Sequence, residues 1–250
     1  MRKTGKSTVR RVYCDLHLHS CLSPCGDDGM TPATAAGMAK LAGLEVAALT
    51  DHNTVRNCPA FFKACAAYGI GALAGMELTT AEDIHLVCLF RDCAAAEVFE
   101  TALAPYRVHI RNRPEFFGRQ LVTDENDAVL YEEPDLLPNA MQLPLEEAFA
   151  LTQNCGGVCY PAHIDRESNG ILAVLGTFPE KPAFRHFELH DLTKLPVLLE
   201  EFPQLNGLQQ LYGSDAHRPQ DVPDRQFFLE VPDGDAPEKA VFTQLKGAYG

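Results

Sequence analysis

Short apolar runs alternate with helical segments along the first ninety residues. The pattern predicts strands over 12–19, 44–50, 70–78 and 84–90, and helices that begin near Pro32 and Asn57. Thr31 followed by Pro32 is typical of a helix N-cap and first helical position. Further strands are predicted over 156–163, 184–190, 208–217 and 225–231. Apolar strands that alternate with helices indicate a parallel sheet buried on both faces, with enough strands for a barrel.

The stretch from about 91 to 150 breaks this rhythm. It opens with a predicted helix that carries His109, and residues 116–133, FFGRQLVTDENDAVLYEE, predict a small hairpin. A helix that ends at Gly156 follows. We interpret residues 106–140 as an insertion, or lid, over the mouth of a single domain that spans residues 1–250.

Composition and charge narrow the classes of function. The chain has 250 residues, of which 46% are hydrophobic, and this suits one domain with a substantial core. Its 21 basic and 34 acidic residues give a net charge of −13, which repels nucleic-acid backbones. A phosphate group could still bind where metal ions reverse the local field.

The lack of a recognisable targeting signal and the spacing of the cysteines bear on the cellular compartment of the protein. The mean hydropathy is −0.12, and no long apolar run predicts a membrane span. The basic start lacks the apolar segment of a secretory signal. The nine cysteines form no CxxC pair, which favours buried, reduced thiols over a structural zinc ribbon. We therefore expect a cytoplasmic protein.

Histidines and carboxylates gather at the predicted strand ends. His17 and His19 lie two residues apart on a strand, so they point to the same side. The carboxyl ends of the strands form the active-site rim in α/β barrels, so residues from different strand ends would meet there. Neutral imidazoles beside carboxylates are a metal-binding donor set. The sequence thus predicts a metal site drawn from His17, His19, His52, His85, His163, His217, Asp15, Asp51, Glu77, Asp165 and Asp215.

Five stretches of the chain resemble the motifs of the PHP (polymerase and histidinol phosphatase) family. They are DLHLHS at 15–20, LTDHNT at 49–54, GMEL at 75–78 with IHLVCLF at 84–90, YPAHID at 160–165, and GSDAHR at 213–218. The resemblance implies an α/β fold, a distorted (β/α)7 barrel. It also implies two or three divalent metal ions (Mn, Zn or Fe) at the barrel mouth and the hydrolysis of phosphoesters.

The resemblance further divides the ligands among the metals. The first metal would be held by His17, His19, Glu77 and Asp215. The second would share Glu77 and be held by His85 and His163. The third would be held by His52 and His217. The catalytic group would be a metal-bound water held by Glu77, Asp215 and His163.

The loop SCLSPCGDDG would supply one more ligand to the third metal. Our first choice is Asp27, and Asp28 and Cys25 are the alternatives. Asp15 and Asp51 are expected to orient ligand histidines through their N–H groups, although Asp51 is equally compatible with a helix or turn cap.

Arginines next to ligand histidines are the candidates for holding the substrate phosphate. Arginine binds phosphate in a bidentate manner. Arg166 and Arg218 follow the motifs at 160–165 and 213–217, and Arg113 and Arg119 in the insertion come next.

The expected function is that of a metal-dependent phosphoesterase acting on a phosphate monoester or a nucleotide phosphoester. The acidic chain favours a small phosphorylated substrate, with a nucleotide or short single-stranded nucleic acid included, and no obligate protein partner is inferred. One alternative is an amidohydrolase-type enzyme on a similar barrel, in which a lysine usually stands in the place of Glu77. The other is a metal-binding module without turnover.

Overall fold

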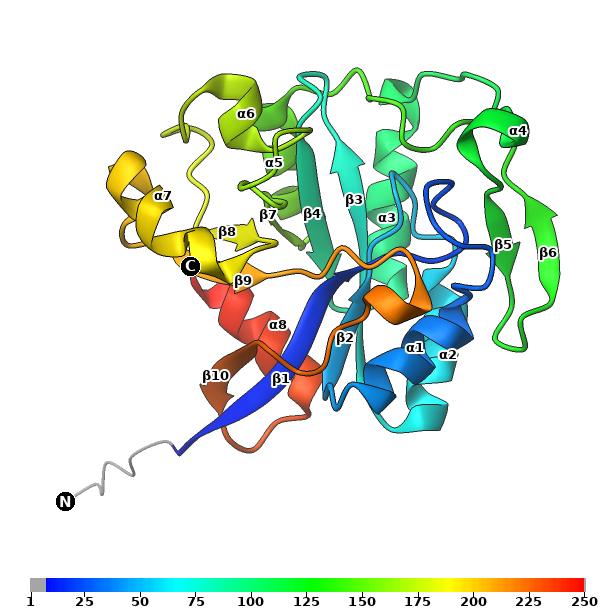
Figure 1. The fold of residues 1–250 in the computed structure, drawn as a ribbon, viewed down its shortest axis with the longest axis horizontal. Helices are drawn as coiled ribbons and strands as arrows, with labels where there is room; N and C mark the ends of the chain where they lie inside the picture. Colours follow the sequence, from blue (N-terminus) through cyan, green and yellow to red (C-terminus); the bar gives the residue numbers. More distant parts are fainter. Residues whose placement is uncertain (1–7, 250) are drawn as a thin grey trace.

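The computed structural model describes residues 8–249, so most of the basic N-terminal stretch lies outside the described residues. Six strands form the main sheet in the order β10-β1-β2-β3-β4-β7 (Figure 1). Their bounds are β1 (Val9–Leu18), β2 (Val46–Leu49), β3 (Gly71–Thr79), β4 (His85–Phe90), β7 (Val158–Pro161) and β10 (Phe228–Pro232). Two smaller sheets pair β8 (His186–Leu189) with β9 (Gln209–Tyr212), and β5 (Leu121–Thr123) with β6 (Val129–Glu132).

Helices join and cover these strands. The longer ones are α1 (Pro32–Leu41), α2 (Cys58–Tyr68), α3 (Cys93–Leu103), α5 (Leu145–Asn154) and α8 (Pro237–Gly247). Shorter ones are α4 (Pro114–Phe117), α6 (Ile171–Leu175) and α7 (Leu195–Glu201), with 3-10 turns at 104–106, 192–194, 203–205 and 219–221. The predicted cap of α1 is confirmed, because the Thr31 side chain accepts a hydrogen bond from the Thr34 N–H.

The main sheet is not wholly parallel, which corrects the sequence prediction. Strands β1, β2 and β3 run parallel, but β4 runs antiparallel to both β3 and β7. Only residues 80–84 separate β3 from β4, too few for a helical crossover between parallel strands. The reversal brings the start of β4 to the edge where β3 ends, and Thr79 pairs with His85.

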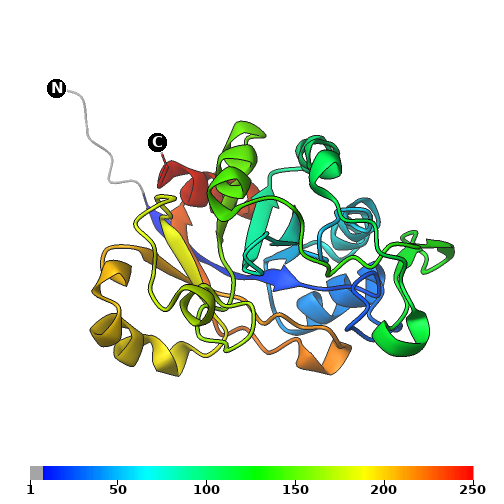
Figure 2. The ribbon, with the colours of Figure 1, turned by 90° about the horizontal axis from the view of Figure 1, so that it is seen from above.

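Backbone hydrogen bonds join the β8–β9 pair to both sides of the main sheet. On one side the Ile164 N–H, just after β7, donates to the Glu188 carbonyl in β8 over 2.9 Å. On the other side the His19 N–H donates to the Ala216 carbonyl over 3.0 Å, just beyond β1 and β9. The result is a curled α/β sheet, seen from above in Figure 2.

The central strands β2, β3, β4 and β7 are buried on both faces, as their near-continuous apolar sequences predict. Alternate residues of β2 divide between two apolar clusters, with Val46 and Ala48 in one and Ala47 and Leu49 in the other. The cluster of Val46 extends from Val12 in β1 to Leu245 in α8, so both ends of the described chain share one core.

The segment between α3 and α5 departs in part from the prediction. The expected hairpin is confirmed as β5 and β6, at the far right of Figure 1. The prediction that a helix carries His109 is wrong: α3 ends at Leu103, and a 3-10 turn with Pro105 near its start follows. Proline lacks the N–H that continues a helix. No helix within residues 8–249 is long and apolar enough to cross a membrane.

We expect Gly75→Ala in β3 to lower the free energy of unfolding by about 1–3 kcal/mol, as overpacking does. A Cβ at Gly75 would lie 2.8 Å from the Cys88 carbonyl oxygen and 2.9 Å from Leu89 and Thr50 side-chain carbons. Denaturant unfolding followed by circular dichroism measures the change.

Gly37→Ala in α1 is the matched control. Its Cβ would come no closer than 3.4 Å, to Tyr68, so we expect a gain of about 0.5–1 kcal/mol from the helix position. Equal stability of the two variants would contradict the expected difference.

Candidate metal centre

One buried carboxylate, that of Glu77 near the end of β3, lies at the centre of the candidate site. Its side chain is 1% exposed. Five imidazoles surround it, with ring nitrogens at 2.7 Å (His85), 2.9 Å (His163), 3.0 Å (His52), 3.3 Å (His19) and 3.4 Å (His17) from a carboxylate oxygen. Burial alone would raise the pKa of Glu77, but the charges of His85, His17 and His52 hold it well below its usual range.

Asp215, in the loop after β9, faces the same imidazoles. Its Oδ1 lies 3.0 Å from His19 Nε2 and 3.4 Å from His17 Nε2. Asp215 and His163 both adopt left-handed backbone conformations, with φ of 53° and 26°. Such conformations are unfavourable for non-glycine residues and are concentrated at functional sites.

The donor atoms fall into three groups within residues 8–249, and in each group they lie within 4.8 Å of one another. The first group contains His17, His19, Glu77 and Asp215; the second His52, Glu77 and His85; the third His19, His52 and His217. The first group contains the same four residues that the family resemblance assigns to the first metal. His163, assigned to the second metal, contacts Glu77 directly.

The donor set fits divalent metal ions. Glu77 Oε2, Asp215 Oδ1 and His217 Nε2 are buried and have no hydrogen-bond partner among residues 8–249. Unsatisfied buried polar atoms are destabilising, and a cation would satisfy all three. Imidazole nitrogens and carboxylate oxygens together suit zinc, manganese and iron.

The imidazoles differ in their charge. Burial lowers the pKa of His19, but the nearby carboxylates of Asp215 and Glu77 outweigh burial and raise it to about 9. Burial and the nearby His19 charge lower the pKa of His217 to about 3. Burial also lowers the pKa of His52. His52 and His217 are therefore neutral at pH 7, the form that binds metals.

Residues behind the imidazoles fix the orientation of their rings. His17 Nδ1 lies 2.8 Å from Glu188 Oε1, and His19 Nδ1 lies 2.8 Å from Ser23 Oγ. These contacts leave the two Nε2 atoms facing each other at 3.1 Å, toward Glu77. Such partners raise the basicity of metal-binding histidines and set their tautomer.

Glu188 and Ser23 were not identified from the sequence as residues of the site. In the stretch FRHFELH, polar residues alternate at 186, 188 and 190, the same two-residue spacing that singled out His17 and His19. This spacing could have drawn attention to Glu188. Ser23 carries no comparable signal.

The structure places Asp51 and Asp15 around the cluster rather than in it. Asp51 accepts hydrogen bonds from the Ser20 and Ser23 hydroxyls over 2.6 and 2.8 Å, and so reaches His19 only through Ser23. Asp15 accepts from the backbone N–H groups of His17 and Ser214, both over 3.2 Å. Burial raises the pKa of Asp15 to about 6.

Arg166 reaches the cluster, where its guanidinium pairs with Asp215 and lies 3.3 Å from His190. The exposed Arg218 side chain makes no ion pair or hydrogen bond with any described residue. Arg113 lies over the ring of Phe116, and Arg119 lies 3.3 Å from Glu132 and 3.5 Å from Asp28.

The three loop candidates for the third metal are placed differently. Cys25 Sγ lies 3.3 Å from His52 Nε2. Asp27 is exposed and accepts a hydrogen bond from the Gly29 N–H over 2.7 Å. Asp28 is exposed and pairs with Arg119. Ligation by Asp27 stays a prediction, and this placement gives it no support.

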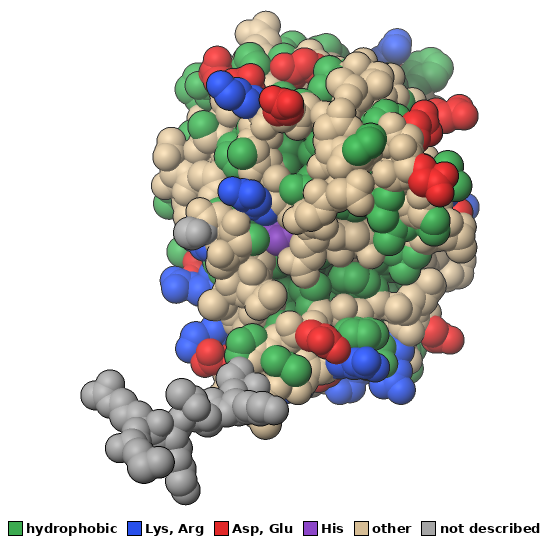
Figure 3. Space-filling model, turned by 90° about the vertical axis from the view of Figure 1, so that its left-hand side faces the viewer, with side chains coloured by type: hydrophobic (Ala, Val, Ile, Leu, Met, Phe, Trp, Pro, Cys, Tyr) green, Lys and Arg blue, Asp and Glu red, His purple; other side chains and the backbone are tan. Residues whose placement is uncertain are grey.

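A cavity of about 380 Å³ opens beside the cluster. Its walls are formed by Pro24, Cys25, His52, His85, Phe117, Leu136, Pro138, Asn139 and Asn169. The segment 106–140 supplies four of these residues. In the side face drawn in Figure 3, one patch of histidine surface is visible in a hollow, next to a basic side chain.

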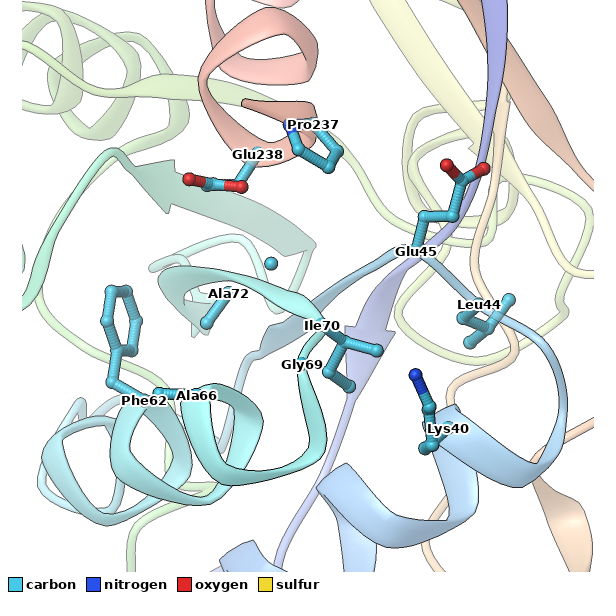
Figure 4. Close-up of a pocket in the computed structure, with 11 residues that line it drawn as sticks. Lys40, Leu44, Glu45, Phe62, Ala66, Gly69, Ile70, Ala72, Pro237 and Glu238 are labelled. Atoms are coloured by element: carbon cyan, nitrogen blue, oxygen red, sulfur yellow. The ribbon is translucent and has the colours of Figure 1, made fainter. Parts of the chain in front are cut away.

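A second cavity, of about 510 Å³, lies at the opposite, amino ends of β2 and β3 (Figure 4). Apolar residues such as Phe62 and Ile70 line it together with Lys40, Glu45 and Glu238. No histidine or cysteine lines it, in contrast to the cavity beside the cluster.

The curled α/β sheet therefore carries a histidine–carboxylate cluster with the donor set of a metal centre. Residues 15–137 match the family model of the PHP domain. This stretch therefore belongs to the PHP domain family, as the motifs within it indicate. No curated protein sequence matches it.

Solved structures share the fold at low sequence identity. The lesion-specific endonuclease EndoQ of Pyrococcus furiosus superposes with a TM-score of 0.64 and 17% identity, over 95% of this chain and 56% of that one. A Chromobacterium violaceum amidohydrolase with bound sulfate gives a TM-score of 0.57 and 19% identity, over 94% and 96% of the two chains. A Bifidobacterium adolescentis protein assigned as a metal-dependent phosphoesterase gives a TM-score of 0.55 and 16% identity, over 91% of this chain and 95% of that one. The chain thus spans little more than half the length of EndoQ.

We expect Glu188→Gln to weaken metal binding about 10- to 100-fold, the usual effect of losing a partner of a ligand histidine. Glutamine retains an acceptor for His17 Nδ1 but not the negative charge. Competition with a metal chelator measures the affinity. Glu200→Gln, on the exposed surface of α7, is the control and should bind metal like the unaltered protein.

Metal affinity should also depend on pH through His19. Because its pKa is about 9, it holds a proton at pH 7 that a bound metal must displace. Although burial lowers the pKa of His17, the charges of Glu188, Glu77 and Asp215 raise it well above its usual value, so His17 must lose a proton as well. Apparent Zn²⁺ affinity should therefore rise at least about tenfold per pH unit between about pH 7 and 8.5. Chelator competition across this range tests the expectation, and a flat profile would contradict it.

Proposed function

We propose that the protein is a metal-dependent phosphoesterase that hydrolyses a phosphate monoester or a nucleotide phosphoester. The observation that carries this proposal is the position of Glu77, which belongs to two of the three donor groups at once. A carboxylate shared in this way suits a pair of neighbouring cations, the arrangement of many phosphatases and nucleases.

We infer that two or three divalent ions (Mn, Zn or Fe) occupy the centre. His17, His19, Glu77 and Asp215 would hold the first, and Glu77, His85 and His163 the second. His52 and His217 would contribute to a third. Such ions supply a hydroxide nucleophile near neutral pH and neutralise the charge of the phosphoryl oxygens.

The chain's own residues would bind and orient the phosphate. Arg166 lies at the edge of the cluster beside Asp215, where its guanidinium can donate to phosphate oxygens. Arg218 follows the ligand His217 and has no partner among the described residues, so it is free to turn toward a bound phosphate. Glu188 and Ser23 would keep the His17 and His19 rings in place.

Residues 106–140 would act as a fixed lid that limits the size of the substrate. Phe117, Leu136 and Pro138 from this segment face the 380 Å³ cavity, which suits a small phosphorylated molecule such as a nucleotide. EndoQ has been crystallised with a 27-mer duplex that carries an abasic lesion. The net charge of −13 favours a nucleotide or a short single strand over a long duplex here.

We further infer that seven strands, β1 to β4 and β7 to β9, form a distorted (β/α)7 barrel within a single domain. The backbone hydrogen bonds that join β8 to the end of β7, and the loop after β9 to the end of β1, support this reading. β10 would then be an extra strand outside the barrel, because it pairs with β1 alone.

The test is phosphate release by the purified protein with Mn²⁺ or Zn²⁺. The substrates are histidinol phosphate, AMP, a 3′,5′-nucleoside bisphosphate and a short single-stranded oligonucleotide, with an amide and a lactone beside them. We expect one phosphoester to be cleaved fastest. Asp215→Asn should reduce its turnover at least about 100-fold, because a catalytic metal contributes several kcal/mol to transition-state stabilisation.

Asp224→Asn, at an exposed position near the same end of the chain, is the matched control and should leave turnover unchanged. Cleavage of the amide or lactone without phosphate release would favour the amidohydrolase alternative. Metal binding with no hydrolysis of any substrate would favour the non-catalytic module.

A further inference from the structure

We propose that Cys25 is a metal ligand: its sulfur, with His52 and His217, forms a mixed sulfur and nitrogen site at the edge of the cluster. Such a site favours Zn²⁺ or another soft cation over Mn²⁺ and Mg²⁺, because thiolates prefer soft metals. The inference rests on the metal dependence of the proposed function but not on its substrate.

The first argument is the contact between Cys25 and the cluster. The sulfur lies 3.3 Å from Nε2 of His52, the ring nitrogen that does not face Glu77. His52 thus presents Nδ1 to the central carboxylate and Nε2 to the thiol. A cation bound by Nε2 would therefore have the sulfur as a neighbouring donor.

The loop that carries Cys25 is fixed to the third histidine of this group. The Asp27 N–H donates to the His217 carbonyl over 3.0 Å, and the Gly26 N–H donates to the Ser23 carbonyl over 2.9 Å. A Cβ at Gly26 would lie 3.2 Å from the His217 carbonyl oxygen, so the two backbones are in close contact. Cys25 is therefore held beside His52 and His217 by backbone hydrogen bonds.

The nitrogen donors of this group are in place without the cysteine. Ring nitrogens of His19, His52 and His217 lie within 4.8 Å of one another, and the rings of His19 and His217 stack at 4.0 Å. His217 Nε2 is buried and has no hydrogen-bond partner among the described residues. A buried, unpartnered imidazole nitrogen beside two others offers the nitrogen part of a metal site, and the thiol adjoins it through His52.

The carboxylates that could replace the thiol are engaged elsewhere. Asp27 caps the Gly29 N–H of its own loop, and Asp28 pairs with Arg119 of the lid. The side chains of both are directed to these partners, whereas Cys25, which is exposed as they are, lines the cavity together with His52. Of the three candidate side chains in the loop, only that of Cys25 makes a hydrogen-bond contact with the cluster among the described residues.

The experiment uses Co²⁺ as a spectroscopic probe for the metal-free full-length protein. Ligation by Cys25 predicts a sulfur-to-cobalt charge-transfer band in the near ultraviolet. Cys25→Ser should lose this band, keep the visible bands of nitrogen- and oxygen-bound cobalt, and bind one metal ion fewer by mass spectrometry. Cys93→Ser, a partly exposed cysteine outside the cluster, is the matched control and should retain both the band and the full metal content.

Cys25→Asp separates loss of the ligand from loss of the fold. It should restore the metal count without the charge-transfer band and shift the preference of that site from Zn²⁺ toward Mn²⁺ by at least about tenfold. A band that persists in Cys25→Ser, or is missing from the metal-loaded unaltered protein, would overturn the proposal. Phosphate release is measured on the same samples. A charge-transfer band without hydrolysis would contradict the proposed phosphoesterase activity but would still support Cys25 as a metal ligand.

Discussion

The buried carboxylate of Glu77 is the constraint on which the site depends. An ionised carboxylate at 1% exposure is strongly unfavourable unless opposite charges or hydrogen bonds compensate it. Five imidazoles from four parts of the chain provide that compensation. The ends of β1, β2, β3 and β7 and the start of β4 must therefore converge on one point, and the curled sheet is the means by which they do so.

The cluster is held in position by residues that do not themselves face its centre. Glu188 contacts Nδ1 of His17, and Ser23 contacts Nδ1 of His19. Asp51 in turn accepts a hydrogen bond from Ser23. Because Nδ1 of both rings is hydrogen-bonded, Nε2 of both rings is directed toward the centre of the cluster without any metal. The site is thus organised by the protein, and ordering it on metal binding demands little conformational entropy.

Asn53 couples the metal centre to the wall of the cavity. It follows His52 in a left-handed conformation with φ of 54°, and its backbone N–H donates to the Glu77 carbonyl. Its side-chain amide donates to the carbonyls of Leu137 and Asn139 and accepts from the Thr79 N–H. The segment that contains Leu137 and Asn139 is therefore attached through Asn53 to the strand that carries Glu77, so hydrogen bonds link this wall of the cavity to the cluster.

The sequence by itself determined the alternation of strands and helices, the cap of α1, and most of the residues that form the cluster. These features follow from the local periodicity of apolar residues and from side-chain chemistry, and both can be read from residues close together in the sequence. Only the tertiary structure decided the reversed direction of β4, the role of Glu188, and the placement of Cys25 rather than Asp27 beside His52. Each of these depends on long-range contacts: His17 and Glu188 are 171 residues apart in the chain, and no local pattern specifies such a pairing.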